Sequence, residues 1–372
     1  MEISERSHIG DISPQEWREL VEKSPDATVF QTHEWLSTWW AMFGEGRSRS
    51  RILVAKKGDR LVGALPLYEA DRRSGSAGHP ILKWVGSEHT DYHCALSENS
   101  DAGIVEALLE AAIELTGRHG EILLEELPQF STADLVLSMR GSSSREMIIK
   151  SAVTPCPRLK LLKNEQGVEA VLRKQSMRRN VRRLATHGNI DVRHMTDPQQ
   201  IRQYLPEFFE QHVDRWRSTK YPSLFETQVN RRFYEHLTET LGSQRKVVFS
   251  SLSLRGIPIA FHFGLCSGND LLWYKPSFDM RLAYLSPGEV LLRYLITYAA
   301  EKGFSALDFT RGDEDFKSRF SSEVRYNSSY HITRRGYRGR RMQLESRFRH
   351  IVGRSVGTAK AKRVTLGGTI AS

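Results

Sequence analysis

The sequence predicts an α/β chain of two tandem units, each a mixed, mostly antiparallel sheet flanked by helices, followed by a basic C-terminal tail. Two hairpin patterns, in residues 51–69 and 246–266, are each followed by a helix, a glycine and a strand, in residues 103–127 and 288–309. Residues 141–165, with GSSS and TPCP, interrupt the periodicity and separate the two patterns. The length of 372 residues is sufficient for two domains.

The composition indicates a globular protein and argues against a membrane-spanning or disulfide-rich one. Hydrophobic residues make up 39% of the chain, which is enough for real cores, and no run approaches the roughly 18 apolar residues of a membrane span. The N-terminus is charged and lacks the apolar stretch of a secretory signal. The three cysteines, Cys94, Cys156 and Cys266, are widely spaced, which argues against a structural zinc site or a disulfide framework. A cytoplasmic protein is the simplest interpretation.

The first unit is expected over residues 1–150. Its hairpin turns at Gly58-Asp59, and a helix then begins after Asp101. A carboxylate at that N-cap position would itself occupy the anion-binding start of the helix. This unit should therefore not bind a phosphate.

The second unit is expected over residues 151–330, with helices over 165–186, 197–218 and 227–241 before its hairpin. A further strand leads into a tight loop at 286–288, where another helix begins. Pro287 suits the first turn of that helix because its missing N–H is not needed there. The free N–H groups and the positive end of the helix dipole favour a phosphate or pyrophosphate. The candidate residues for binding it are Leu285, Ser286, Gly288, Glu289 and Val290.

The region from this helix onward resembles the GNAT superfamily of acyl-CoA-dependent N-acyltransferases, and within it the double-GNAT group of CelD-like and FemAB-like proteins. The residues that carry the resemblance are Pro287-Gly288, Asp308-Phe309, Arg311-Gly312-Asp313, Phe316-Lys317 and Arg319-Phe320. One departure is the helix start Ser-Pro-Gly-Glu, where the family usually has Gln or Arg followed by paired glycines.

The resemblance implies direct transfer of an acyl group from acyl-CoA, such as acetyl-CoA, to an amine or hydroxyl of a small molecule or sugar. No permanently bound cofactor is expected. The first unit would form the acceptor side, with a degenerate donor site, and the setting would be envelope or exopolysaccharide synthesis. The alternatives are FemAB-like transfer from aminoacyl-tRNA and a non-catalytic accessory protein of polysaccharide synthesis.

Four residues are candidates for the chemistry. Asp308 lies among apolar neighbours, so partial burial could raise its pKa and make it a base, although pairing with Arg311 or Lys317 is nearly as plausible. The resemblance implies that Lys317 contacts the donor phosphate or the reacting carbonyl, and Arg311 lies in the same turn. His262 alternates on a strand and could face the cleft or be a hydrogen-bonded core histidine.

Candidates for substrate binding are Asp91, Tyr274 and Asp313; pairing of Asp313 with Arg311 across Gly312 is the alternative for that residue. In the EHTDYH segment His89, Asp91 and His93 are spaced by two, so a strand would place them on one face. That face is compatible with zinc, but a polar patch without metal is favoured, and we predict no metal site.

The net charge of +10 comes from the tail, expected over 331–372. Residues 331–363 contain eleven Lys or Arg and one acid, and the rest of the chain is balanced. Residues 334–363 could contact an anionic membrane surface at its inner face, contact nucleic acid, or pack on the body. A second basic block over 173–183 could bind the phosphates of CoA or tRNA, or be a solvated face.

Overall fold

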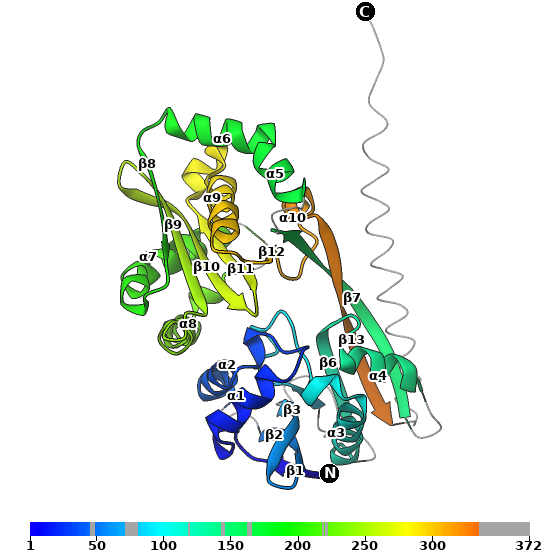
Figure 1. Ribbon diagram of the computed structural model, residues 1–372. Coiled ribbons are helices and arrows are strands. Elements are labelled where there is room, and N and C mark those ends of the chain that lie inside the picture. Colours follow the sequence, from blue (N-terminus) through cyan, green and yellow to red (C-terminus); the bar gives the residue numbers. More distant parts are fainter. Residues whose placement is uncertain are drawn as a thin grey trace, which may run out of the picture.

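The protein is described from a computed structural model, which covers residues 1–44, 49–70, 81–117, 120–142, 146–161, 166–217, 219 and 222–334. Within these residues one mixed sheet of 13 strands runs through the molecule, with helices on both faces (Figure 1). The strand order is β1-β2-β3-β4-β6-β13-β7-β12-β11-β10-β9-β8, with β5 paired to β3. The predicted mixed α/β architecture is confirmed.

The strands are β1 (Glu2–Arg6), β2 (Arg49–Lys57), β3 (Arg60–Ala70), β4 (Ile81–Trp84), β5 (Leu96–Ser97), β6 (Glu121–Pro128), β7 (Glu146–Lys160), β8 (Ile190–Met195), β9 (Val247–Leu254), β10 (Ile257–Ser267), β11 (Asp270–Phe278), β12 (Ala306–Asp308) and β13 (Glu323–Arg334). The helices are α1 (Pro14–Glu22), α2 (His33–Trp39), α3 (Ala102–Leu115), α4 (Thr132–Arg140), α5 (Gln166–Arg173), α6 (Gln175–Ala185), α7 (Pro198–Trp216), α8 (Gln228–Thr240), α9 (Pro287–Glu301) and α10 (Asp315–Phe320).

The two halves of the sheet have the same plan. Each contains one parallel pair, β4 with β6 and β11 with β12, while the other pairs are antiparallel. A parallel pair needs a crossover connection, and α3 and α9 supply it in the two halves. The hairpins β2–β3 and β9–β10 precede these crossovers, as predicted from the sequence.

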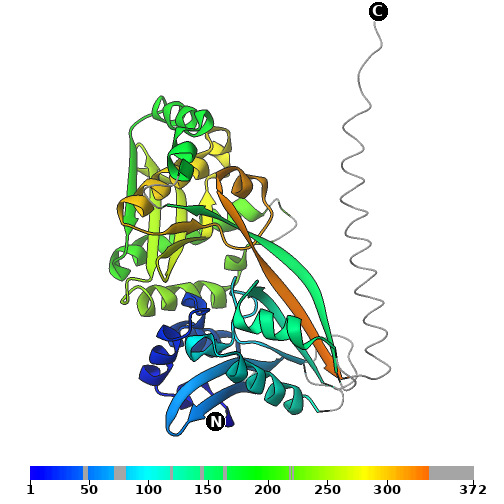
Figure 2. The same ribbon diagram turned by 45° about the vertical axis from the view of Figure 1, so that its right-hand side comes forward.

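Strands β7 and β13 connect the two halves. β13 pairs with β7 along its whole length and also with β6, so the last described strand completes the sheet of the first half. Figure 2 shows these two strands as a long ribbon that runs from one half to the other. The proposed boundaries at 150/151 and 330/331 fall inside these strands, and the division into units stays a prediction.

The expectation that TPCP interrupts regular structure is wrong, because Pro155 and Pro157 lie within β7. A proline cannot donate to a ladder but can still accept. The carbonyl oxygens of Pro155 and Pro157 accept hydrogen bonds from the N–H groups of Gly312 and Phe309, which follow the short strand β12. The segment after β12 therefore stays attached to β7.

Alternate residues of β11 face two different cores. Leu271 and Trp273 pack in the cluster that contains the buried face of α9. Leu272 and Tyr274 face the opposite side, in a cluster shared by α7, α8 and α2. In that cluster the Trp35 ring of α2 lies 5.4 Å from the Phe233 ring of α8, centroid to centroid. The two halves therefore share one apolar core.

The helix expected over 165–186 is two helices, α5 and α6, that break at Lys174. Lys174 is the N-cap of α6 and has an extended ψ of 128°. The break allows Val171 of α5 and Met177 of α6 to pack into the same cluster beneath α9. The exposed arginines of the basic block lie mostly on α6.

No helix in the described part of the chain is long and apolar enough to cross a membrane. Strand β13 extends to Arg334, so the first residues of the predicted tail are part of the sheet. Residues 335–372, and with them nearly all of the proposed membrane-contacting segment 334–363, lie outside the described residues.

Candidate active site

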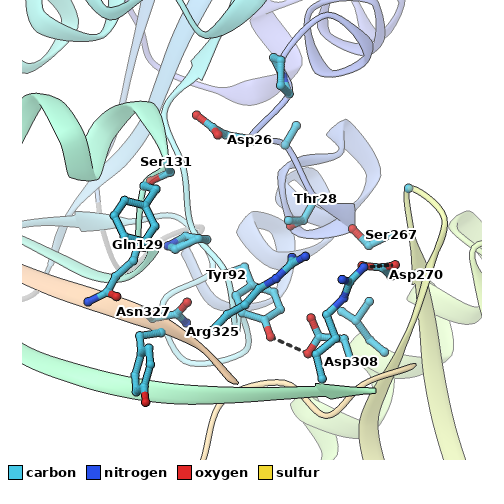
Figure 3. Close-up of a pocket in the computed structure, with 18 of the residues that line it drawn as sticks. Asp26, Thr28, Tyr92, Gln129, Ser131, Ser267, Asp270, Asp308, Arg325 and Asn327 are labelled. Atoms are coloured by element: carbon cyan, nitrogen blue, oxygen red, sulfur yellow. Dashed lines mark hydrogen bonds and ion pairs between the residues drawn. The ribbon is translucent and has the colours of Figure 1, made fainter. Parts of the chain in front are cut away.

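A cleft of about 860 Å³ lies between the two halves of the molecule (Figure 3). Segments far apart in sequence contribute to it: the loop before α2, the turn between β6 and α4, the turn between β10 and β11, and strands β7, β12 and β13. Its polar lining includes Asp26, Thr28, Gln129, Ser131, Ser267, Asn269, Asp270, Asp308, Arg325 and Asn327. A cleft with many hydroxyl, amide and charged groups suits a polar ligand.

Asp308, the last residue of β12, lines this cleft and is 6% exposed. Its Oδ1 accepts two hydrogen bonds of 2.7 Å, from the Tyr92 hydroxyl and from the Thr310 N–H. Burial raises the pKa of Asp308 to about 6, and the two hydrogen bonds oppose this rise. Its hydrogen bonds go to neither Arg311 nor Lys317, so the alternative pairing considered from the sequence is not formed.

Tyr92 comes from the first half of the chain, and Figure 3 shows its hydroxyl pointing at the Asp308 carboxylate. Burial, followed by the nearby Asp308 carboxylate, raises the pKa of Tyr92 well above its usual value, so the phenol remains a donor. Thr310 has a φ of 57°, which is strained for a β-branched residue. Such strain is found where the surrounding structure fixes a functional conformation.

Arg311, whose side chain is 34% exposed, joins the two halves through ion pairs with two more deeply buried carboxylates. Its Nε lies 2.8 Å from the Asp91 Oδ1, and its Nη1 lies 3.3 Å from the Glu126 Oε1. Asn327 donates from Nδ2 to the Asp91 carbonyl oxygen and to the Glu126 Oε2. Two predicted site residues, Arg311 and Asp91, are thus brought together, and Arg311 does not pair with Asp313, which is exposed.

Lys317 supports the same turn from α10. Its Nζ donates to the Arg311 carbonyl oxygen at 2.6 Å and lies 2.9 Å from the Glu314 Oε2. Gly312 has a φ of 130°, and a Cβ there would lie 2.7 Å from the Lys317 Nζ. The positive φ favours glycine, so Gly312 and the Lys317 hydrogen bond together fix the conformation of the turn after β12.

His262 is a core residue. Its ring is fully buried on β10, stacks on Trp273 at 4.4 Å, and accepts the Tyr274 N–H at Nε2. Burial lowers the pKa of His262 to about 3, which keeps the ring neutral. Tyr274 is also buried; its hydroxyl donates to the His89 carbonyl oxygen and accepts from Tyr234. Both residues lie among core side chains, and neither lines the cleft.

The strand expected through residues 89–93 is not formed, because this segment is a loop between β4 and β5. His89 accepts from the Trp39 Nε1 and is hydrogen-bonded to Asn230, while the His93 ring stacks on Trp84. His89, Asp91 and His93 therefore make three separate contacts and do not share one face. Among the described residues no set of three His, Cys, Asp or Glu side chains could hold a metal ion.

The predicted start of α9 is present, with Pro287 as its first residue and Ser286 left-handed at a φ of 56°. The N–H groups of Glu289 and Val290 donate to the Ser286 carbonyl oxygen. Leu285 and Val290 are core residues, and the Glu289 and Val290 N–H groups are engaged within the helix, so the Gly288 N–H remains as a donor at this helix start. At the start of α3, by contrast, the Asp101 carboxylate accepts two backbone N–H groups, as predicted.

Glu289 connects the start of α9 to two neighbouring helices. Its carboxylate lies 2.6 Å from the Arg319 Nη2 of α10 and accepts from the Asn180 Nδ2 of α6 at 2.9 Å. These contacts place the basic helix α6 beside the proposed phosphate-binding site. Gly288 lies against Phe278, whose ring would be 3.2 Å from an added Cβ.

Strands β11 and β12 separate just beyond Asp308. The last pair between them joins Leu272 to Asp308, and the chain then follows β7, while β11 continues to Phe278. We call this divergence of residues 273–278 from residues 309–312 the wedge. The cleft with Asp308 lies at one end of these strands, and the start of α9 follows the other end of β11.

Sequence reasoning missed Tyr92, Glu126 and Lys275 as residues near the site. Tyr92 lies between Asp91 and His93, but in a strand through this segment its side chain would face the side opposite to theirs. Glu126 has a φ of 56°, which the sequence does not reveal. Lys275 follows the aromatic pair Trp273-Tyr274, and the sequence indicates only that it lies near the end of a strand.

The comparisons with known proteins agree with this fold. Residues 172–318 match the family model for the acetyltransferase (GNAT) domain. FemX has a TM-score of 0.60 at 12% identity over 88% of this chain and 97% of FemX. A conserved protein of unknown function from Bacteroides thetaiotaomicron VPI-5482 has a TM-score of 0.58 at 12% identity, over 90% and 100% of the two chains.

A third solved structure is the C-terminal DUF2156 domain of an Agrobacterium fabrum protein described as a lysylphosphatidylglycerol synthetase. Its TM-score is 0.55 at 11% identity, over 90% of this chain and 95% of the domain. No curated protein matches the sequence. Residues 172–318 therefore match the acetyltransferase (GNAT) domain, and 88% of the chain shares its fold with FemX.

Proposed function

We propose that the protein transfers an acyl group from acyl-CoA to an amine or hydroxyl of a small molecule or sugar held in the cleft. The observation that carries this proposal is Asp308: a carboxylate on β12 of the GNAT segment, with a pKa near 6, lining a polar cleft. A base with a pKa near the working pH is suited to general base catalysis.

The proposed reaction is direct attack. Asp308 accepts a proton from the acceptor ammonium or hydroxyl, and the resulting nucleophile attacks the thioester carbonyl carbon. The new C–N or C–O bond forms, the C–S bond breaks, and the CoA thiolate leaves and takes up a proton. Backbone N–H groups of β11 beyond Leu272 would stabilise the oxyanion, since those of Phe309, Thr310 and Gly312 are already hydrogen-bonded, and much of the rate would come from positioning the two substrates.

Exposed aromatic residues at the cleft support a sugar acceptor. Phe130 is 79% exposed and has a strained φ of 68°, which the Asp134 carboxylate holds by accepting its N–H. Tyr326, 43% exposed, also lines the cleft. An exposed aromatic ring gains little from packing, but it offers a face for the C–H surface of a sugar ring. The proposed setting, by resemblance, is envelope or exopolysaccharide synthesis.

The donor assignment predicts that Gly288→Asp weakens acetyl-CoA binding at least tenfold, about 1.4 kcal/mol, in a calorimetric titration. The new carboxylate would repel a phosphate at the start of α9. Gly288→Ala is the matched control, since its Cβ makes the same approach to Phe278 without the charge. If the wild-type protein does not bind acetyl-CoA, the acyl-CoA donor is wrong.

A second candidate donor is aminoacyl-tRNA, which the FemAB-like resemblance implies. It is favoured by the exposed side chains of Arg178, Arg179, Arg182 and Arg183 on α6, held beside α9 by Asn180. Phosphate contacts of this kind make affinity fall steeply with salt.

A tRNA donor predicts that the pair Arg178→Gln and Arg179→Gln weakens tRNA binding and lowers the slope of log affinity against log salt by about one to two. The control is the pair Arg217→Gln and Arg232→Gln, two exposed arginines on the other face of the sheet. Equal losses in both pairs would indicate non-specific attraction. An accessory protein would bind neither acetyl-CoA nor tRNA.

A further inference from the structure

Three arginines from three different helices line one pocket of about 450 Å³. They are Arg173 of α5, Arg178 of α6 and Arg293 of α9, and Glu169 and Leu172 of α5 complete the lining. These helices lie together at the end of the second half that is farthest from the first half (Figure 1). Among the described residues that line this pocket Glu169 is the only acid, so three positive charges face one negative charge.

Arg293 is held in place by the end of α5. Its Nη1 donates to the carbonyl oxygen of Leu172, in the last turn of that helix, where carbonyl groups have no partner within the helix. Among the described residues its guanidinium has no other hydrogen-bond partner. A guanidinium carries five N–H donors in one plane. The single bond therefore fixes the direction of the group and leaves its other donors available.

The other two arginines are also available to a ligand. Arg173 lies 2.6 Å from Glu169, but the two side chains are 77% and 69% exposed, and an exposed pair of this kind contributes little. Arg178 is exposed and forms no ion pair with any residue in the described ranges. Glu289, one turn before Arg293 on α9, is engaged by side chains of α6 and α10 instead.

A pocket of this kind suits a phosphate monoester. Arginine binds phosphate through paired N–H···O contacts, and a monoester carries a charge of about −1.5 to −2 at pH 7, so one such group can neutralise most of the excess. A merely solvated face needs no convergence on one pocket. The remaining arginines of α6, Arg179, Arg182 and Arg183, are exposed and do not line it.

We propose that this pocket binds a phosphate monoester, supplied by the 3'-phosphate of acyl-CoA or by a separate phosphorylated compound. Arg178 and Arg293 contact the phosphate, and Arg173 exchanges Glu169 for it. This inference rests on the proposed function, which it deepens by giving the donor a second phosphate site. CoA carries a diphosphate and a 3'-phosphate.

The position of the pocket fits the CoA source. Gly288 at the start of α9 and Arg293 are five residues apart, about 7.5 Å along the helix axis. A thioester at the wedge, a diphosphate at the start of α9 and a 3'-phosphate beside Arg293 would follow the order in which β11 and α9 succeed one another.

The test compares acetyl-CoA with 3'-dephospho-acetyl-CoA in calorimetric titrations. Wild type should bind acetyl-CoA at least tenfold more tightly. Arg178→Gln, and the pair Arg178→Gln with Arg293→Gln, should lose most of this preference and bind the dephospho form as wild type does. The single variant is needed because Arg293 also bonds to α5, whereas Arg178 bonds to nothing in the described fold. The control pair Arg179→Gln and Arg182→Gln removes the same charge from exposed positions outside the pocket.

Thermal unfolding in sodium phosphate, with sodium chloride at equal ionic strength as reference, distinguishes the two sources. A rise in Tm that both arginine variants reduce, without a preference for acetyl-CoA, assigns the pocket to a separate phosphorylated compound; the preference itself assigns it to CoA. The proposal is overturned if Arg178→Gln changes neither quantity, or if the control pair changes them as much. Should wild type bind no acetyl-CoA, the proposed donor fails, while the response to phosphate still decides the pocket.

Discussion

Asp308→Asn is expected to lower kcat/KM by about 10²–10⁴-fold, the usual contribution of a general base. The asparagine Oδ1 can still accept hydrogen bonds from Tyr92 and Thr310, so the local geometry is preserved while the base is removed. In wild type, kcat/KM should fall below about pH 6, as the carboxylate is protonated. The acyl-transfer rate measured against pH checks both statements.

The same substitution is expected to stabilise the protein. Folding raises the pKa of Asp308 from 3.8 to about 6, so the folded state holds a proton between these pH values that the unfolded state has released. The free energy of unfolding therefore decreases as pH rises from about 4 to 6, and the loss persists at pH 7. Asp308→Asn should recover on the order of 1–3 kcal/mol at pH 7 and little at pH 4.

Denaturant unfolding of both proteins at the two pH values measures this gain. A structural carboxylate would give the opposite result, with lost stability and retained activity. Tyr92→Phe is a useful companion, because it removes a hydrogen bond that lowers the pKa of Asp308. The acidic limb of its rate profile should move above that of wild type. An unchanged limb in Tyr92→Phe, with full activity in Asp308→Asn, would exclude Asp308 as the base.

Local features of the sequence were sufficient to predict much of the fold. Pro287 and Gly303 delimit α9 in sequence, and the capping carboxylate of Asp101 follows from its position before Ala102-Gly103. These signals act over a few residues through backbone geometry, so they can be recognised from the sequence without knowledge of tertiary contacts. The expectation that Asp308 is buried also came from its immediate apolar neighbours.

Contacts between distant segments were not predictable in this way. Tyr92 and Asp308 are 216 residues apart, and no local pattern indicates that a loop of the first half donates to a strand of the second. The spacing of His89, Asp91 and His93 resembles that of a strand, yet each residue contacts a different partner. β13 returns to the first half because pairing with both β6 and β7 completes the sheet, which is a property of the whole topology.

Arg311→Met is expected to cost about 1–3 kcal/mol of unfolding free energy, less than the removal of one partner from a fully buried ion pair, because the Arg311 side chain is 34% exposed and water screens the pair. The side chains of Asp91 and Glu126 are 6% and 12% exposed, so two neighbouring carboxylates would be left without their cation. The cost comes from this uncompensated negative charge. Denaturant unfolding measures it, with Arg325→Met, at an exposed arginine, as the control.

A double substitution shows whether this cluster joins the two halves. Adding Asp91→Asn to Arg311→Met removes one of the stranded charges and should recover part of the loss, with a coupling of about 0.5–3 kcal/mol between the two positions. Without such coupling, the halves would be held by the core that Trp35 and Phe233 share, and Arg311 would serve the site alone. If the coupling is found, the ion-pair cluster that positions the turn after Asp308 also holds the first half of the chain in place. Tyr92 would then be held against Asp308 by the same cluster. The geometry of the proposed base would then depend on an ion pair that spans both halves of the chain.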